Sequence, residues 1–548
     1  MKRTKRTLIA ILCLMLSSML LLTACTGEPQ TEPNATASNS PATQPDETPA
    51  ESTPNTPSDS QLKDTIVGVL KTDVGTLNPF DLNNANMKRM AGPILEPLVL
   101  YGEDGELECI LAESYEFNED CTAITIKLKE GVLFHNGEEL TADDVIYTSQ
   151  GYAAGNTKSD VSAIDTANIE AIDKYTVRFP SSTGTSNSTM LEYIKNIQIV
   201  NKKYMEDPTT DKTTWMVGTG PYVLTEYKAG DHLSYTAFEN YHGGKAKTQN
   251  MVLRFIAETS VAMIELEQGN VDIIFDALTT DIERVTNGEV SGLKTISGPN
   301  TALYMMVFNN ANEPLNNLKV RQAIAHAINK EDIRIAAFND YSVVAHSPIP
   351  VGSFGFDQKW LEQNPYEYNL DTAKALLAEA GYADGFEVRL VHDGSASFTE
   401  IADMLIYQLN QINITVNLIQ YDTATVTDIL KGNDWDITLK SMTSNGEAMV
   451  GLTMYGDYTN AGEGGSVITH IANDPNAPGY LDLLNKCMAT GEREERKAVY
   501  AEIQDYFNEN IWYLPLVCKS TVILAKDSLE GAYVMGSLVY VNDAYIPQ

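Results

Sequence analysis

Residues 131–145 read GVLFHNGEELTADDV and place a turn signal shortly before a helix start. Asn136-Gly137 is a dipeptide typical of tight turns. Thr141 stands where a helix N-cap is expected, and Asp144 follows at the third helical position, which is the capping-box pattern. The stretch therefore predicts a turn at Asn136-Gly137 and a helix that begins after Thr141.

On both sides of this stretch, from Thr65 onward, strand patterns alternate with helix patterns. The sequence shows no obvious internal repeat. Ile124, Ile126 and Leu128 alternate with polar residues, as in a half-buried strand. Further strands are expected at residues 66–70, 175–179, 414–418 and 511–517, and helices at 320–328, 373–380, 398–412 and 499–507. Mixed order of this kind predicts an α/β fold with two lobes.

The length and charge of the chain limit its class. Its 548 residues predict about two to four domains, and the apolar share of 43% suffices for sizeable cores. The formal net charge is −36, whereas phosphate binding needs clustered lysine and arginine, so we expect no nucleic-acid partner. The excess of negative charge is expected to keep the protein soluble and to make its molecules repel one another. The alternative explanation is that the charge attracts a cationic ligand.

The sequence offers little support for catalysis or a cofactor: Ser60-Gln61-Leu62-Lys63 matches the SxxK pattern, but it lies at the end of the Thr/Ser/Pro-rich segment and is interpreted as a chance match. Gly218-Thr219-Gly220 precedes Pro221, which lacks the amide that a phosphate cradle uses, and Gly462-Glu463-Gly464-Gly465 has no following Lys-Ser or Lys-Thr pair. Neither a HExxH zinc motif nor a GxSxG nucleophile elbow is present. We therefore expect a protein that is not an enzyme and holds no cofactor.

The cysteines do not form a metal-binding pattern. They are Cys13, Cys25, Cys109, Cys121, Cys487 and Cys518, without a CxxC pair or a cysteine-histidine cluster, so no metal site is expected. Cys109–Cys121 and Cys487–Cys518 disulfides are candidates in an extracytoplasmic protein. Buried free thiols are the alternative.

The N-terminal segment has the pattern of a targeting signal. A basic segment over residues 2–6 precedes an uncharged apolar run over residues 8–22, which is short for a membrane-spanning helix and suits a signal peptide. Leu22-Thr23-Ala24-Cys25 resembles a bacterial lipobox. Residues 1–24 are therefore expected to be removed and Cys25 to be diacylated. Cleavage by an ordinary signal peptidase with full secretion is the alternative.

The segment after Cys25 is expected to be a tether. Residues 26–60 are rich in Thr, Ser and Pro and contain no Lys, Arg or aromatic residue. Such a segment buries too little apolar surface to fold. Residues 25–60 are therefore expected to anchor the folded body in the membrane and to hold it at a distance.

Seven short motifs of the sequence resemble those of the family 5 extracellular solute-binding proteins, which are the receptors of bacterial peptide and nickel ABC importers. The motifs follow one another in the same order as in the family. The most specific is the 131–145 stretch, which resembles the family pattern GVKFHDGTPLTADDV. The others are Gly75–Pro79, Leu111–Tyr115, Gly218–Tyr222, Val320–Ala323, Ala373–Tyr382 and Leu514–Leu516. Each motif alone is weak, but their common order is specific, and the similarity runs from about Thr65 to the last residues.

The resemblance implies a two-lobed, periplasmic-binding-protein-like α/β fold with an extra subdomain and a two-strand hinge. On this basis residues 61–300 form lobe I, with the subdomain inserted at about 104–215. Residues 301–518 form lobe II, and residues 519–548 return to lobe I. The hinge strands are expected near Ile296–Phe308 and Cys518–Leu524.

The resemblance also implies ligand-binding segments. Family peptide receptors hold an extended ligand backbone between strands of both lobes. The corresponding residues here are Leu82, Asn83 and Asn84 in one segment and Ser441, Met442, Thr443, Ser444 and Asn445 in the other.

The second segment departs from the family pattern GWxxD, whose aspartate meets the ligand ammonium. Met442 stands at the tryptophan and Asn445 at the aspartate. A shift of register would let Glu447 supply the carboxylate. Otherwise the ligand lacks a free amine or binds through other anchors.

The function that the resemblance implies is capture of oligopeptides or peptide-like solutes by lobe closure for an ABC permease and ATPase. The protein is expected to be a monomer, lipid-anchored on the outer side of the bacterial cell membrane. The alternatives are a receptor for a metal chelate, opine or glycoside, and a peptide sensor or chaperone without import. A surface hydrolase is the remaining alternative.

Overall fold

The computed structural model describes residues 62–73, 75–81, 85–182, 184, 186–212, 215–338, 340–444, 446–456 and 469–548. The predicted signal peptide, lipidated Cys25 and tether lie outside the described residues. So do four of the predicted ligand-binding residues, Leu82, Asn83, Asn84 and Asn445.

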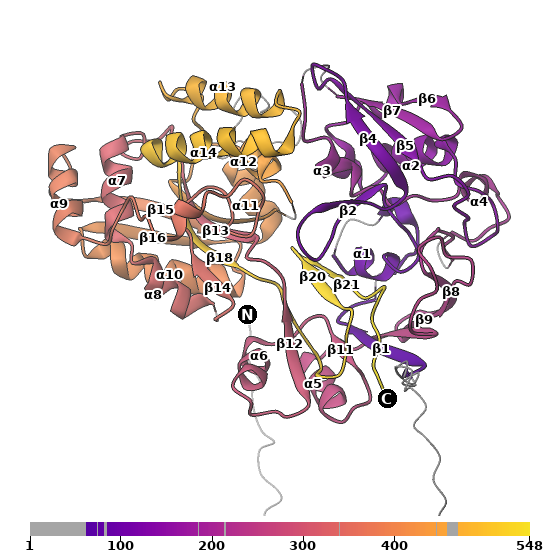
Figure 1. The fold of residues 1–548 in the computed structure, drawn as a ribbon. Coiled ribbons are helices and arrows are strands. Elements are labelled where there is room, and N and C mark those ends of the chain that lie inside the picture. Colours follow the sequence, from indigo (N-terminus) through magenta and orange to yellow (C-terminus); the bar gives the residue numbers. More distant parts are fainter. Residues whose placement is uncertain are drawn as a thin grey trace, which may run out of the picture. The chain divides into compact units, whose positions relative to one another are not determined.

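The first large sheet is seven-stranded and has β1 at its centre (Figure 1). In sheet order its strands are β12 (Leu293–Ser297), β19 (Val522–Lys526), β11 (Ile273–Ile274), β1 (Thr65–Leu70), β10 (Asn250–Phe255), β9 (His232–Ala237) and β8 (Tyr222–Lys228). The strand predicted at residues 66–70 is confirmed as β1, which pairs in parallel with both β10 and β11. Pairing on both edges buries β1, in agreement with its apolar sequence.

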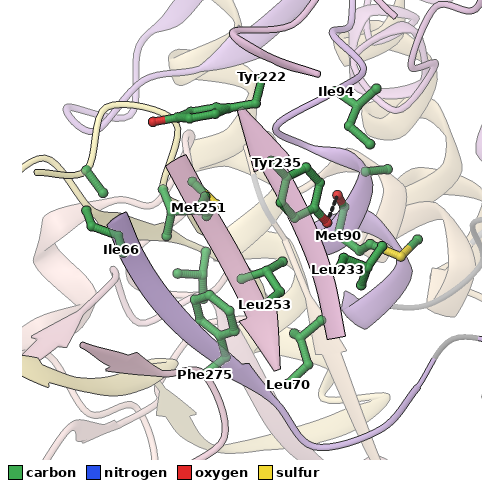
Figure 2. Close-up of a cluster of buried hydrophobic side chains, with 14 of the residues drawn as sticks. Ile66, Leu70, Met90, Ile94, Tyr222, Leu233, Tyr235, Met251, Leu253 and Phe275 are labelled. Atoms are coloured by element: carbon green, nitrogen blue, oxygen red, sulfur yellow. Dashed lines mark hydrogen bonds between the residues drawn. The ribbon is translucent and has the colours of Figure 1, made fainter. Parts of the chain in front are cut away.

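One face of this sheet packs against α1 (Ala85–Ala91) and the C-terminal segment. Figure 2 shows Leu253 and Phe275 from the sheet region beside Leu70, with Met90 and Ile94 from the segment of α1 nearby. The Tyr235 hydroxyl donates a hydrogen bond to the Met90 carbonyl at 3.2 Å, which satisfies a buried phenol. The opposite face is covered by α5 (Thr259–Glu267) and α6 (Thr279–Thr286).

The second large sheet is six-stranded and mixed. In sheet order its strands are β14 (Ser342–Val344), β18 (Tyr513–Lys519), β13 (Ala302–Phe308), β17 (Ile437–Thr443), β15 (Phe386–His392) and β16 (Ile414–Gln420). Leu418 of the predicted strand at 414–418 is 39% exposed because β16 is the last strand of the sheet. One face packs on α7 (Leu318–Ala327), α8 (Lys330–Ala337), α9 (Leu370–Glu379) and α10 (Ala396–Asn410), and the other on α11 (Thr423–Leu430), α12 (Met449–Gly456), α13 (Ala477–Met488) and α14 (Arg493–Asn510).

The predicted apolar stripes are confirmed as helices of this second region. They become α7, α9, α10 and α14, and Gly381 ends α9 with a φ of 89°, a conformation that glycine adopts readily. The strand predicted at 511–517 was placed two residues too early, because Ile511 has a φ of 43° and ends α14 before β18 begins at Tyr513.

A smaller four-stranded sheet carries the 131–145 stretch beside it. Its strands, in sheet order, are β4 (Ala112–Phe117), β5 (Ala123–Leu128), β7 (Thr176–Pro180) and β6 (Glu170–Asp173), and α2 (Ala142–Ala154) packs on it. The turn and helix start are confirmed: the Gly137 amide donates to the Phe134 carbonyl at 2.8 Å, and the Asp144 carboxylate accepts from the Thr141 amide at 3.0 Å. Burial raises the pKa of that carboxyl group, against the effect of these hydrogen bonds.

The remaining elements are short. They are the β2–β3 hairpin (Val99–Tyr101, Leu107–Cys109), the β20–β21 hairpin (Tyr533–Met535, Leu538–Tyr540), α3 (Leu191–Ile194), α4 (Lys202–Glu206) and 3₁₀ turns at Pro79–Asp81, Lys158–Val161, Thr166–Asn168 and Gln358–Leu361. In the described part of the chain, no helix is both long and apolar enough to cross a membrane.

The chain passes between the two large sheets at residues 298–301, from β12 to β13, and at residues 520–521, from β18 to β19. A Cβ on Gly298 would lie 2.7 Å from the Val534 carbonyl oxygen, so the β20–β21 hairpin packs directly on the first crossing. Both crossings fall inside the ranges predicted for the hinge strands.

Cys109, Cys121, Cys487 and Cys518 are free thiols. Neither candidate disulfide is formed; Cys121, Cys487 and Cys518 are buried, as the alternative predicted, whereas Cys109 is partly exposed. Burial raises the pKa of the Cys487 and Cys518 thiols to about 12, so both stay protonated at neutral pH.

Candidate functional site

The predicted ligand segment 441–445 begins on β17, whose second edge is open over most of its length. β17 pairs with β13 from Ile437 to Thr443, but β15 contacts it only at Ile437 and Thr438. Among the described strands, none pairs with this second edge over Leu439–Thr443. An open edge carries main-chain donors and acceptors that an extended ligand can pair with.

The side chains of this segment alternate across the strand, as strand geometry requires. Ser441 and Thr443 are exposed, whereas Met442 is buried among the apolar residues that α11 to α14 cover. Thr443 lies opposite Ala302, where the chain enters β13 from the first crossing. The open edge therefore ends beside the crossings between the two sheets.

Ser444 ties the end of β17 to the first crossing. Its amide donates to the Thr301 carbonyl at 3.1 Å, and its hydroxyl donates to the Glu447 carbonyl at 3.0 Å. The Ser353 hydroxyl donates to the Ser444 carbonyl at 3.4 Å. These contacts hold Ser444 against Thr301 and Glu447, and a ligand contact for Ser444 stays a prediction.

Glu447 is buried in an ion cluster with Arg493, Arg496 and Tyr500. Both carboxylate oxygens accept from Arg496, whose Nε lies 3.0 Å from Oε2, and the Tyr500 hydroxyl donates to Oε2 at 3.0 Å. The Arg493 Nε lies 3.6 Å from Oε1. The carboxylate is thus satisfied by protein partners, and its predicted role toward a ligand ammonium stays untested.

Gly446, next to Glu447, also contacts residues that belong to the β2–α3 part of the chain. A Cβ on Gly446 would lie 2.1 Å from a ring carbon of Tyr101 and 2.7 Å from a carboxylate oxygen of Glu192, so only glycine fits this approach. Tyr101 donates a short hydrogen bond to Glu192. Burial raises the pKa of the Glu192 carboxyl group.

Further contacts join the α13–α14 connection to the same part of the chain. The Ser188 amide donates to the Met488 carbonyl at 2.7 Å, and an ion pair joins Arg493 and Glu106 at 2.6 Å. Sequence reasoning missed Arg493, Arg496 and Tyr500, since helical periodicity assigns α14 an apolar face and says nothing about its polar contacts.

A cavity of about 180 Å³ lies in the seven-stranded-sheet region, and sequence reasoning missed it. Its walls come from α1, the segment 93–97, β3, the segment 195–198 and the C-terminal residues 538–543. Glu96 in this wall is saturated, because it accepts from Thr219 at 2.8 Å, Tyr241 at 2.7 Å and His242 at 2.9 Å. Arg89 and Lys195 also line the cavity.

No group of three or more His, Cys, Asp and Glu side chains in the described ranges is placed to hold a metal ion. The candidate features are an open strand edge, a buried ion cluster and a cavity in the first-sheet region.

Two mixed α/β sheets joined by two chain crossings, with an extra four-stranded sheet, define the two-lobed fold of periplasmic binding proteins. The model of the bacterial extracellular solute-binding proteins, family 5 (middle), matches residues 106–463, and the chain belongs to this family. The predicted family and fold class are confirmed.

The chain is similar to proteins with different ligands. Heme-binding protein A of Haemophilus influenzae is 25% identical over 448 residues, covering 75% of this chain and 79% of that protein. The structure of HbpA2 from Haemophilus parasuis matches with a TM-score of 0.79 and 22% identity, over 88% of this chain and 100% of the other. The ABC transporter-associated periplasmic binding protein DppA from Helicobacter pylori, in complex with the peptide STSA, matches with a TM-score of 0.69 and 21% identity, over 88% of this chain and 98% of the other.

Membership of the family gives the general function. Family 5 proteins are extracytoplasmic substrate-binding proteins that work with the permease and ATPase of ABC importers. The chain is therefore a substrate-binding protein of this type.

Proposed function

We propose that this protein captures oligopeptides or peptide-like solutes by lobe closure and passes them to an ABC permease. The observation that carries the proposal is the open edge of β17 over Leu439–Thr443, beside the crossings between the sheets. A peptide backbone that pairs with this edge gains main-chain hydrogen bonds whatever its side chains are. Exposed Ser441 and Thr443 leave room for varied ligand side chains.

The domain division proposed from the resemblance is supported by the positions of the crossings. Lobe I spans 61–300 with the subdomain at about 104–215, lobe II spans 301–518, and 519–548 return to lobe I. The contacts of Arg493 and Ser188 with the other lobe support a closed arrangement. We also propose that the receptor is a monomer and releases its ligand unchanged.

Short peptides are expected to raise the melting temperature of the protein, because a ligand at about 100 times its Kd raises the free energy of unfolding by about 2.7 kcal/mol. Peptides N-methylated at alternate positions are expected to bind at least about tenfold more weakly, since they lose a main-chain donor to the open edge. Thermal shift followed by isothermal titration calorimetry measures both effects.

The control for this screen is a set of non-peptide solutes that includes heme, nickel chelates, opines and sugars. Heme is included because of the similarity to heme-binding protein A. Stabilisation by one of these and by no peptide would refute peptide capture and favour a non-peptide receptor.

The lipid anchor is proposed at Cys25, after the lipobox Leu22-Thr23-Ala24. Replacing Cys25 with Ser is expected to move the protein from the membrane fraction to the soluble fraction, because two acyl chains are lost. Fractionation and mass spectrometry of the N-terminal peptide measure this. Cys13→Ser, within the apolar run, is the matched control and should leave the anchor intact. Persistent membrane association of the Cys25→Ser variant would refute the anchor.

A further inference from the structure

We propose that Arg493 and Gly446 form a latch that holds the two lobes closed and thereby slows release of the captured solute. Both residues lie in the range proposed for lobe II, and they meet residues in the range proposed for lobe I. Neither residue belongs to the chain crossings at 298–301 and 520–521, so the latch adds a contact that the chain connection does not require. The proposal rests on the proposed capture by lobe closure.

The two lobes share no apolar core where the four-stranded sheet region meets lobe II. Phe80 and Tyr204 pack against the cores of both the seven-stranded and the four-stranded sheet, which supports placing these two sheets in one lobe. None of the described residues belongs both to the core of the four-stranded sheet and to a core of the six-stranded sheet. A few polar and aromatic contacts therefore decide whether this part of the protein stays closed.

Arg493 supplies an attraction between the lobes. Its guanidinium carbon lies 3.8 Å from the centre of the Phe354 ring, in its own lobe, and 5.7 Å from the centre of the Tyr101 ring, in lobe I. Its Nη1 donates to the Glu106 carboxylate of lobe I at 2.6 Å. Two of these three partners are lost when the lobes separate, so the guanidinium favours the closed arrangement.

Gly446 permits the close approach of the lobes. A Cβ at this position would lie 2.1 Å from a ring carbon of Tyr101 and 2.7 Å from a carboxylate oxygen of Glu192, and its three nearest atoms all belong to these two residues of lobe I. Tyr101 and Glu192 are buried and hydrogen-bonded to each other, so moving them aside is costly. The φ of Gly446 lies outside the left-handed region, so alanine fits the backbone and its methyl group would obstruct closure.

One main-chain hydrogen bond between the lobes reports this closure. The Ser188 amide of lobe I donates to the Met488 carbonyl of lobe II at 2.7 Å. The neighbouring Asn187 amide donates to the Cys121 carbonyl at 2.8 Å, within lobe I. A hydrogen-bonded amide exchanges its proton with water when its bond opens. Exchange at Ser188 therefore measures separation of the lobes, and Asn187 is the internal reference.

The test is hydrogen exchange of the Cys25→Ser chain without ligand, read at single residues by mass spectrometry with electron-transfer fragmentation. Arg493→Met is expected to speed exchange at Ser188 about tenfold or more, because the contacts of the cation with Tyr101 and Glu106 are lost. Gly446→Ala is expected to do the same by obstructing closure. Exchange at Asn187 should stay unchanged in both variants.

Two matched control variants lie in lobe II and leave the latch intact. Lys486→Met removes a cation whose partner Glu502, at 2.7 Å, belongs to the same lobe. Gly432→Ala adds a Cβ that meets only the Ile429 carbonyl oxygen, at 3.7 Å, which is an ordinary contact. Both variants should exchange at Ser188 as the unsubstituted chain does.

The effect on the solute is measured with the peptide Ala-Leu-Leu by surface plasmon resonance. Arg493→Met and Gly446→Ala are expected to speed dissociation of the peptide about tenfold or more, with a smaller change in the association rate, because the latch acts after the solute has entered. Faster exchange at Ser188 without faster dissociation would overturn the role of the latch in solute release.

The remaining outcomes separate the latch from peptide capture. Unchanged exchange at Ser188 in both variants would overturn the latch and leave peptide capture standing. Equal acceleration at Asn187 and Ser188 would also overturn it, because the segment would then be unfolding locally. Failure of every peptide to bind would count against peptide capture alone, since the exchange measurement decides the latch without a ligand. The two variants act by different routes, so either one that folds decides the result.

Discussion

Replacing Glu447 with Gln is expected to lower the free energy of unfolding by about 3–5 kcal/mol. Glu447 is 4% exposed and is the anion that faces Arg496, which is 3% exposed, so the neutral amide would leave a buried guanidinium without its counter-charge. Chemical denaturation followed by tryptophan fluorescence measures the loss. Urea midpoints at a fixed pH suffice, since the substitution keeps the size of the side chain.

The double variant Glu447→Gln/Arg496→Met is expected to recover much of this loss, because removing both partners removes the uncompensated charge. Glu494→Gln is the matched control: this exposed carboxylate pairs with Lys497 on the same helix and contributes about 1 kcal/mol or less. Unchanged stability of Glu447→Gln would contradict the ion cluster. Weakened peptide binding in a folded variant would instead support the predicted contact of Glu447 with a ligand ammonium.

Replacing Lys330 with Met is expected to change how stability depends on pH between about 7 and 10.5. Lys330 is 6% exposed at the start of α8, and its Nζ donates to the Ala345 carbonyl at 2.8 Å. Burial lowers the pKa of its ammonium from 10.5 to about 7. Met has a similar shape and does not titrate.

The sign of this pH dependence follows from the number of protons that the protein takes up when it unfolds. The unfolded chain keeps the Lys330 proton up to about pH 10.5, whereas the folded protein releases it above about pH 7. Unfolding therefore takes up a proton in this window, and stability rises by about 1.4 kcal/mol per pH unit. This contribution is fully present above the unfolded pKa and is lost as the pH falls through the folded pKa.

The stability of the unsubstituted protein relative to Lys330→Met should thus rise by roughly 3 kcal/mol from pH 7 to pH 9.5. Burial also lowers the pKa of the neighbouring His346 to about 3 and raises that of Cys518 to about 12. Both residues are present in the two proteins, so their contributions to the pH dependence are common to both and the difference isolates Lys330. Lys319→Met, an exposed position on α7, is the control and should give the same difference at both pH values. A pH-independent difference for Lys330→Met would show that the lysine is solvated in the folded state.

Local sequence patterns predicted those helices and strands correctly whose structure depends only on residues close together in the chain, such as the apolar face of a helix. The stripes of α10 and α14 and the capping pair Thr141–Asp144 depend on residues within a few turns of one another. Such signals survive folding because helix geometry fixes which residues share a face. The start of β18 was misplaced because Ile511 adopts a left-handed conformation that its β-branched side chain does not predict.

The candidate site was predicted only in part. Family motifs gave Ser441, Met442 and Thr443, and the structure adds that their strand has an open edge, a property of the whole sheet. Glu447 was considered as a ligand contact on its charge alone. Its partner Arg496 lies 49 residues further along the chain, and no periodic pattern links the two.

The sequence by itself determined the class of this protein, because ordered motifs and helical or strand periodicity are properties of neighbouring residues. Only the tertiary structure decided which charges are paired and with which partner. Arg496 pairs with Glu447, 49 residues away, and Arg89 pairs with Asp276, 187 residues away. The physical reason is that burial and hydrogen-bond partners arise from segments far apart in the chain, brought together only when the sheets pack.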